Sequence, residues 1–170
     1  MTTFLTGKLV QICTFDESHV EPLTEWINTQ DISQYINAFR PMMLEEEKKW
    51  RESLVESKTD FVFALISNDA DRKFFGIMGV HRVDHRNQTA STGAIIGVPA
   101  YQGKGYGTDA KMHILHWAFN ELNLRKINSS VLATNPRSQA YLEKTGYQKV
   151  GKGTPRSRKL NTRRKRRVFF

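Results

Sequence analysis

The 170-residue sequence predicts an α+β domain, α/β sandwich-like, with a mixed, mostly antiparallel sheet and about four helices. Two observations support this fold class. After a first strand and several helical patterns, β-rich segments separated by polar turns follow, as in an antiparallel meander. A strand, a glycine-rich loop, a helix and a further strand come next, an order that favours a parallel strand pair with a right-handed crossover. We expect one domain over residues 1–151 and a basic segment over 152–170.

The N-terminal elements are predicted from periodicity and caps. Phe4–Phe15 predicts a first strand, with a turn allowed at Gly7. Asp16–Asn28 predicts a helix, since apolar residues recur on one face and Ser18 and Glu21 have the spacing of a capping box.

Two more helices are expected before the sheet. A short one is predicted around Ile32–Ile36 and ended by Pro41. An amphipathic helix over Glu45–Glu56 has acidic residues in its first turn, which suits the helix dipole. The meander strands then follow as Phe61–Ile66, Phe74–Asp84 and Thr89–Val98.

The crossover unit occupies the next part of the chain. A helix from Thr108 to about Glu121 leads to a strand over Lys126–Thr134. Asn135 then has the position of an N-cap, with Pro136 as the first residue of a short helix that ends before Gly146.

Composition restricts the class of protein. Hydrophobic residues make up 39% of the chain, as in an ordinary globular domain. The net charge of +9 arises from the tail, since residues 149–170 hold ten Lys/Arg and no acidic residue, and the remaining 148 residues hold 16 basic and 17 acidic ones. The single cysteine, Cys13, excludes an internal disulfide and fits a reducing, cytoplasmic compartment. We expect no signal peptide and no membrane span. We also expect no metal site, because the five histidines lack the spacing of metal ligands.

The glycine-rich loop predicts an anion site. It places three glycines, Gly103, Gly105 and Gly107, between an apolar strand and a helix start, where backbone N–H groups and the helix dipole favour a phosphate. Lys104 adds a full positive charge. The third glycine comes one position too early for a dinucleotide loop, and no Lys-Ser/Thr pair follows it as in a Walker loop. A diphosphate is favoured, and a glycine turn that only connects two elements is the alternative.

Several segments together carry a family resemblance over about residues 4–151. They are Asp84 with Asn87, Gly97, Gln102–Ala110, Ala118–Ile127, Asn135 with Ser138, and Leu142–Tyr147. Their order resembles the GNAT acetyltransferases, especially the RimJ/RimL-like branch of ribosomal-protein N-acetyltransferases and the spermidine acetyltransferases.

The resemblance implies the GNAT fold and acetyl-CoA as co-substrate. In that fold the parallel strands, here Thr89–Val98 and Lys126–Thr134, splay apart, pantetheine enters the V, and the loop amides hold the diphosphate. The implied cofactor-binding residues are Ile96, Val98, Gln102, Gly103, Lys104, Gly105, Tyr106, Gly107, Thr108, Asn135 and Ser138.

The implied reaction is direct acetyl transfer to a primary amine in a ternary complex. The acceptor is a protein N-terminal amine or a small amine such as a polyamine. The resemblance places it under the loop between the first two helices, near Ile36, Arg40, Met42 and Met43, and His81 is a further candidate substrate-binding residue.

The thiolate partner departs from the family pattern. Many members have a tyrosine seven residues after the asparagine equivalent to Asn135, and this chain has Leu142 there. Three catalytic candidates remain, each with a structural alternative. Ser138 either donates a hydrogen bond to the thiolate or only helps to begin the helix. Asn135 binds pantetheine or caps. Tyr141, rotated by about 100° on the helix, is an acid or a cofactor-wall aromatic.

The sequence does not single out one general base. The strand before the loop carries no carboxylate. His81, Glu47, a water-mediated route and an amine that arrives neutral are the alternatives.

The basic tail has three interpretations. It forms a hairpin with Asn161-Thr162 near its turn and Val168–Phe170 as the last strand, or a cationic arm that contacts RNA or the ribosome, or an end without a selected role. The tail and Leu142 motivate the alternative function, a non-catalytic CoA-binding or RNA-associated module. We expect a monomer or homodimer that does not contact membranes.

Overall fold

A six-stranded mixed sheet forms the centre of the structure, a computed structural model that describes residues 1–36, 40–152 and 167–170. The strands lie in chain order: β1 (Thr3–Thr6), β2 (Val10–Thr14), β3 (Phe61–Ser67), β4 (Phe74–Asp84), β5 (Thr89–Ile96) and β6 (Lys126–Asn128). Neighbouring strands are antiparallel except β5 and β6, which run parallel. The mixed, mostly antiparallel sheet with one parallel pair confirms the predicted fold class.

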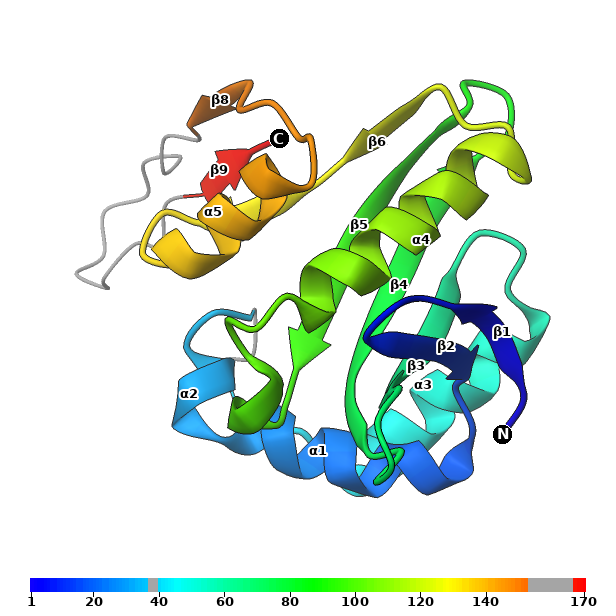
Figure 1. Ribbon diagram of the computed structural model, residues 1–170, viewed down its shortest axis with the longest axis vertical. Helices are drawn as coiled ribbons and strands as arrows, with labels where there is room; N and C mark the ends of the chain where they lie inside the picture. The colour runs from blue at the N-terminus through cyan, green and yellow to red at the C-terminus, as the bar shows by residue number, and fades with distance from the viewer. Residues whose placement is uncertain (37–39, 153–166) are drawn as a thin grey trace.

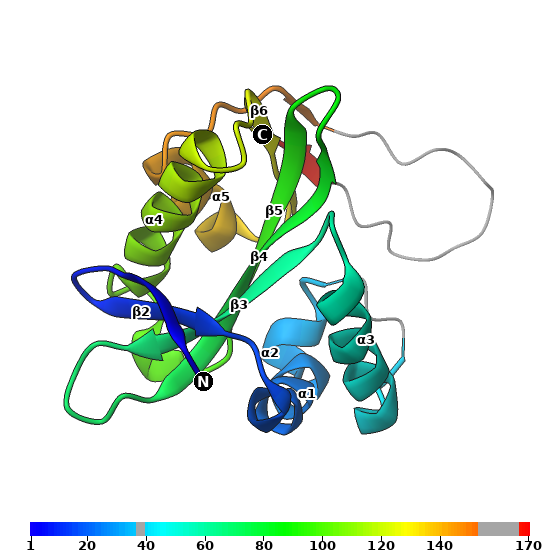
Figure 2. The same cartoon turned by 90° about the vertical axis from the view of Figure 1, so that its right-hand side faces the viewer.

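Helices cover both faces of this sheet (Figures 1 and 2). One face carries α4 (Tyr106–Asn120), and the other carries α1 (Val20–Asn28) and α3 (Leu44–Glu56). The short α2 (Gln30–Ser33) follows α1, and α5 (Pro136–Lys144) lies beyond the splayed strands. Single 3-10 turns precede α1 at Glu17–His19 and follow β5 at Pro99–Tyr101.

Strand alternation divides the core into two layers. On β4, Met78 and Val80 pack in the layer under α4, and Ile77 packs in the layer under α1 and α3. Since successive side chains point to opposite faces, His81 lies on the α1/α3 face. Thr92 of β5 pairs with Val80 and therefore lies on the α4 face. The cofactor is thus expected on the α4 face of the sheet and the amine acceptor on the α1/α3 face.

The parallel pair ends early. Its register covers only Thr89 with Lys126 through Ser91 with Asn128. The predicted strand Lys126–Thr134 is therefore two strands, because the chain turns away at Ser129 and β7 (Ser130–Leu132) joins a second sheet.

The second sheet has the order β7-β9-β8, with β8 at Gly151–Lys152 and β9 at Arg167–Phe169. Ser129 exchanges both backbone hydrogen bonds with Phe170, at 3.0 and 2.9 Å. A last strand at the end of the tail is therefore present and pairs antiparallel with β8. The proposed turn at Asn161-Thr162 lies outside the described residues.

Two N-terminal predictions need correction. The segment Phe4–Phe15 is a hairpin of β1 and β2, closed around Gly7, whose N–H donates to the Val10 carbonyl. The capping box is formed by Asp16 and His19, and not by Ser18 and Glu21. The Asp16 carboxylate accepts from the Ser18 N–H, and the His19 ring accepts from the Asp16 N–H, so the helical segment begins two residues earlier than that spacing implied.

Gly97 allows α1 to pack against the end of β5. A Cβ at this position would overlap the Trp26 indole. Gly97→Ala should therefore destabilise the fold by about 1–3 kcal/mol, since the ring or α1 must move. Denaturant unfolding measures the loss. Gly151→Ala, where a Cβ meets no atom within 4 Å, serves as the control, and equal stability of the two variants would contradict the packing argument.

Candidate functional site

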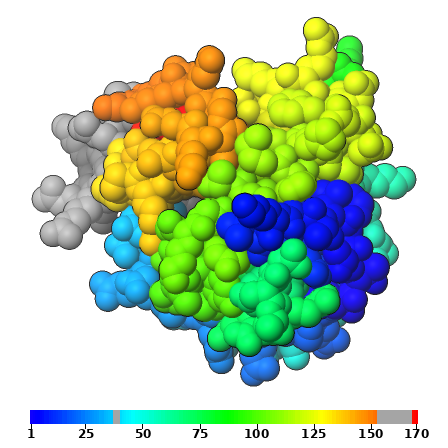
Figure 3. Space-filling model, viewed as in Figure 1, coloured from blue at the N-terminus to red at the C-terminus, as the bar shows by residue number. Residues whose placement is uncertain are grey.

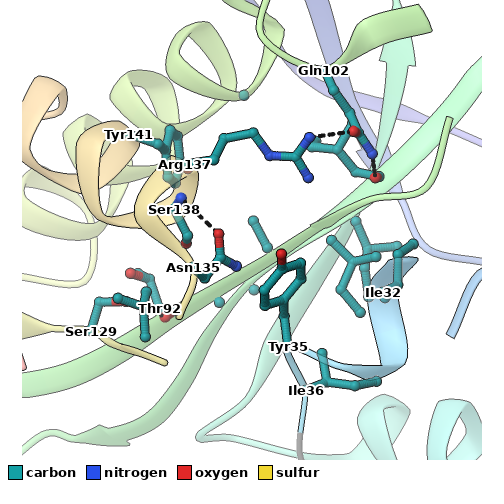
Figure 4. A pocket seen from close by; sticks show the side chains of 18 of the residues that line it. Ile32, Tyr35, Ile36, Thr92, Gln102, Ser129, Asn135, Arg137, Ser138 and Tyr141 are labelled. Atoms are coloured by element: carbon teal, nitrogen blue, oxygen red, sulfur yellow. Dashed lines mark hydrogen bonds between the residues drawn. The ribbon is translucent and has the colours of Figure 1, made fainter. Parts of the chain in front are cut away.

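A cavity of about 820 Å³ runs past the free edge of β5. Its lining comes from both sides of the sheet: the glycine loop, α4 and α5 on one side, and α1, α2 and α3 on the other. Figure 3 shows α5 and the loop before α4 side by side on one surface, and Figure 4 shows the interior. The splay of β5 and β6 at Ser129 creates this passage.

The glycine loop begins α4 with inverted backbone geometry. Gly103 and Gly105 have φ values of 72° and 93°, a region that glycine enters without steric cost. Gly105 is the N-cap of α4. Because glycine has no side chain, this residue leaves the space at the helix N-terminus open. Gly107 and Thr108 follow in the first turn and line the cavity. Since the first N–H groups of a helix have no partner within it, this end of α4 has the donors and the dipole that an anion site requires.

A side-chain bridge spans the mouth of the cavity. Arg137 of α5 donates to Gln102 Oε1 at 2.6 Å, and Gln102 Nε2 donates to the Ile96 carbonyl at 2.8 Å (Figure 4). The bridge connects α5 to the end of β5. It places an exposed guanidinium next to the glycine loop.

The start of α5 contributes three of the predicted site residues. Asn135 caps the helix, because its side-chain oxygen accepts from the Ser138 N–H at 3.0 Å, and Pro136 is the first helical residue as predicted. Ser138 and Tyr141 line the cavity. The Tyr141 hydroxyl is buried without a hydrogen-bond partner in the described chain. Burial raises the pKa of Tyr141 well above its usual value.

An Asp–His pair lies on the α1/α3 face. His81 Nδ1 is 3.2 Å from Asp60 Oδ1, an arrangement that leaves Nε2 for the cavity. The ring lies over two glycines that face each other across the strands, Gly79 and Gly93, and a Cβ at Gly93 would be 3.8 Å from Nε2.

The pKa values of His81 and Asp60 are both lowered, for different physical reasons. Burial lowers the pKa of His81, and the hydrogen bond and charge of Asp60 oppose this effect in part. Burial raises the pKa of Asp60, yet hydrogen bonds led by that from Thr59 and the Arg82 N–H bring it below its usual value. Half-buried and neutral near pH 7, His81 is poised to accept a proton.

The acceptor side is lined mainly by apolar and aromatic residues. These are Leu23, Ile27, Ile32, Tyr35, Ile36, Met42, Trp50 and Ile77. Figure 4 shows the Tyr35 hydroxyl directed into the cavity. Glu47 is the buried carboxylate on this side, 6% exposed, and burial raises its pKa. Such a chamber suits an amine attached to an apolar group.

Most of the predicted site residues come together here. The lining includes Ile96, Gln102, Gly103, Gly105, Gly107, Thr108, Asn135, Ser138, Tyr141, Met42 and His81. Five predicted side chains do not line it. Arg40 donates to Glu46 at 2.8 Å, Val98 and Tyr106 pack in the core under α4, and Met43 and Lys104 are exposed.

Several residues of the site were not predicted. Asp60, Lys111 and Arg137 have no motif of their own. Lys111 did carry a signal, because it continues the buried stripe of Ile114, Leu115 and Ala118 at helical spacing. A lysine at such a position is unusual for a surface helix.

No group of three or more His, Cys, Asp or Glu side chains in the described part of the chain is placed to hold a metal ion. Among residues 1–36, 40–152 and 167–170, no helix combines the length and the apolar character needed to cross a membrane.

Comparisons with known proteins agree with this geometry. A family model described as "Acetyltransferase (GNAT) domain" matches residues 10–148. The N-acetyltransferase 9-like protein of Caenorhabditis briggsae is 23% identical over 80% of this chain and 73% of its own length. The SPbeta prophage-derived uncharacterized N-acetyltransferase YokL of Bacillus subtilis is 29% identical over 65% of this chain, which spans only 60% of that relative.

Solved structures share the fold. The spermidine N-acetyltransferase of Vibrio cholerae, solved in complex with CoA and spermine, superimposes with a TM-score of 0.81. The alignment covers 95% of each chain at 20% sequence identity.

Proposed function

The chain belongs to the GNAT acetyltransferase family, and on that premise we propose that it moves an acetyl group from acetyl-CoA to a primary amine by direct attack in a ternary complex. One observation carries the proposal. A single cavity joins the glycine loop to the apolar chamber under α1 and α3 past the free edge of β5. Two substrates entering from opposite faces of the sheet would meet at this edge.

The cofactor fits the α4 face. Its diphosphate would lie on the amides of Gly103 to Thr108, with Arg137 nearby. From the end of β5 at Ile96 to the splay at Thr92 is about 13 Å at 3.3 Å per residue. A pantetheine arm along this edge would hydrogen bond to the strand backbone between the Ile96 and Thr92 carbonyls, which accept from Gln102 and Ser129, and bring the thioester to the splay. Backbone N–H groups there would stabilise the oxyanion.

His81 is our choice for the proton acceptor. The acceptor amine reaches the thioester from the α1/α3 face, where His81 Nε2 is oriented by Asp60. A group whose pKa lies near the working pH is best suited to take a proton at physiological pH. Glu47, buried on the same side, is the alternative base or holds the amine as an ion pair.

The acceptor class follows from the lining. An apolar chamber with a buried carboxylate suits a peptide N-terminus with an apolar neighbour or a small apolar amine, in line with the RimJ/RimL-like branch. A polyamine, as bound in the Vibrio cholerae structure, is a second candidate. Contact of the basic tail with RNA or the ribosome would aid a ribosomal substrate.

Turnover with a panel of amines tests the function. Full-length protein is incubated with acetyl-CoA and peptides with free N-termini, phenylethylamine or spermidine, and released thiol and acetylated product are measured. We expect amine-dependent thiol release with one class of acceptor. CoA binding without turnover above background would instead support the alternative, a non-catalytic CoA-binding module, which Leu142 motivates.

A further inference from the structure

Lys111 is a buried amine in the wall of the cavity. It lies in the second turn of α4, its side chain is 1% exposed, and it lines the cavity on the α4 face. A lysine on a helix normally extends its ammonium to water. This one does not.

No carboxylate in the described part of the chain compensates the buried charge. Among the described residues no ion pair includes Lys111. Its Nζ lies 5.8 Å from the centre of the Tyr141 ring and 5.9 Å from that of Tyr147. On the opposite side of the sheet its charge helps to lower the pKa of His81. Burial lowers the pKa of Lys111 itself to about 7.

A buried ammonium without a counter-charge destabilises a fold. Strongly perturbed groups in clefts are typical of functional sites. A charge that the fold accommodates at this cost is better explained by a negative group that arrives with a ligand. The cofactor side of the cavity offers such a group, since thioester cleavage leaves a thiolate.

Neighbouring contacts place Lys111 at the splay. The Tyr147 hydroxyl is 2.7 Å from Thr92 Oγ1, and Thr92 lies on the α4 face where β5 and β6 separate. Ser129 Oγ donates to the Thr92 carbonyl at 3.1 Å from the other arm of the V. The ring beside Lys111 is thus fixed to the point where an arm along β5 would end.

We propose that the Lys111 ammonium faces the sulfur of acetyl-CoA and gives its proton to the departing thiolate. This inference rests on the proposed function. The acceptor nitrogen forms the new C–N bond and the C–S bond breaks with its electron pair on sulfur. A proton passes from Nζ to sulfur to give CoA–SH, and the amine loses its own proton to His81 or water. Lys111 and His81 return to their starting states by exchange with solvent.

The other candidates on this side are weaker proton donors. Leu142, at the position of the family tyrosine, is apolar and 2% exposed. Tyr141 holds its proton too firmly, because burial raises its pKa, and burial raises the pKa of Tyr147 to about 12. Ser138 is left to donate a hydrogen bond to the sulfur, without supplying a proton.

The acidity of the bound CoA thiol tests this inference directly. The absorbance of the CoA thiolate is measured as a function of pH in the CoA complex. The same titration of the desulfo-CoA complex is subtracted, which removes the absorbance changes of Cys13 and the tyrosines. In the wild type we expect the bound thiol to be about 10 to 1,000 times more acidic than free CoA. Lys111→Met should remove this shift and lower turnover at least tenfold, with CoA affinity nearly unchanged. Lys144→Met, a lysine at the rim of the same cavity, is the matched control and should leave the shift in place.

Lys111→Arg separates charge from proton donation. Arginine keeps its proton at any working pH, so this variant should retain the acidic thiol but lose turnover. Loss of activity by unfolding is checked by thermal melting. Lys111→Met should melt at the same temperature or higher, because methionine fills the space without a buried charge.

Three outcomes would overturn the inference. A bound thiol equally acidic in the wild type and Lys111→Met would do so while leaving the proposed function intact. Acetylation of Lys111 in the wild type, found by peptide mapping, would make it an acyl acceptor. Failure of the wild type to bind CoA would remove the proposed function as well.

Discussion

Gly105→Glu should abolish measurable binding of CoA. The new carboxylate would enter the helix N-terminus at the position proposed for the diphosphate, and like charges in contact cost several kcal/mol. The backbone adds to the loss, since φ is 93° at this residue and a Cβ is strained there. We expect the affinity to fall at least 100-fold, measured by calorimetry with CoA and full-length protein.

Two further variants separate charge from conformation. Gly105→Ala introduces only the backbone strain, about 1–2 kcal/mol, and should weaken binding less. Gly151→Glu adds the same charge at a glycine in the second sheet where a Cβ has open space, and should leave affinity unchanged. Wild-type affinity in Gly105→Glu would place the diphosphate elsewhere.

The conformation of the glycine loop and of the α5 cap was predictable because its signals are local. Glycines that need φ above zero, an N-cap and a proline at the first helical position are each read from a few neighbouring residues. Gly103, Gly105 and Asn135 accordingly behave as predicted. The bounds of β4, Phe74–Asp84, were also predicted, since polar turns enclose one apolar run.

The proton-handling groups were harder to predict because they depend on pairing between distant segments. Asp60 and His81 are 21 residues apart and meet only because β3 returns along β4. The break at Ser129 is set by its hydrogen bonds with Phe170, at the far end of the chain. Lys111 continues the apolar stripe of α4 at helical spacing, but only the packing of α4 shows that its amine is buried. Chemistry at this site therefore depends on tertiary contacts that carry no motif.

The two proposed proton-handling residues occupy opposite faces of β5. His81 lies on the acceptor side and Lys111 on the cofactor side. The charge of Lys111 lowers the pKa of His81, so each favours the protonation state that the reaction needs: a neutral base and a charged acid. This arrangement would compensate for Leu142 at the usual tyrosine position.

His81→Gln should lower turnover by about 100-fold or more, the usual contribution of a general base. The groups that face His81 are Asp60, Arg82 and Lys111. Since the base acts when neutral and burial lowers its pKa, wild-type activity should rise with pH through a value below 6.5 and fall again as Lys111 loses its proton near pH 7. In His81→Gln the rise on the acid side should disappear or move to the pKa of the amine itself.

The control for this variant is His85→Gln, since His85 is an exposed histidine just beyond β4 that contacts the Lys58 carbonyl at 3.4 Å. Its activity should equal that of the wild type. His81→Ala leaves space over Gly79 and Gly93, and added imidazole should restore part of its turnover. Full activity of His81→Gln over the same pH range would show that Glu47, water or an amine that arrives neutral performs this step, because none of these depends on the imidazole.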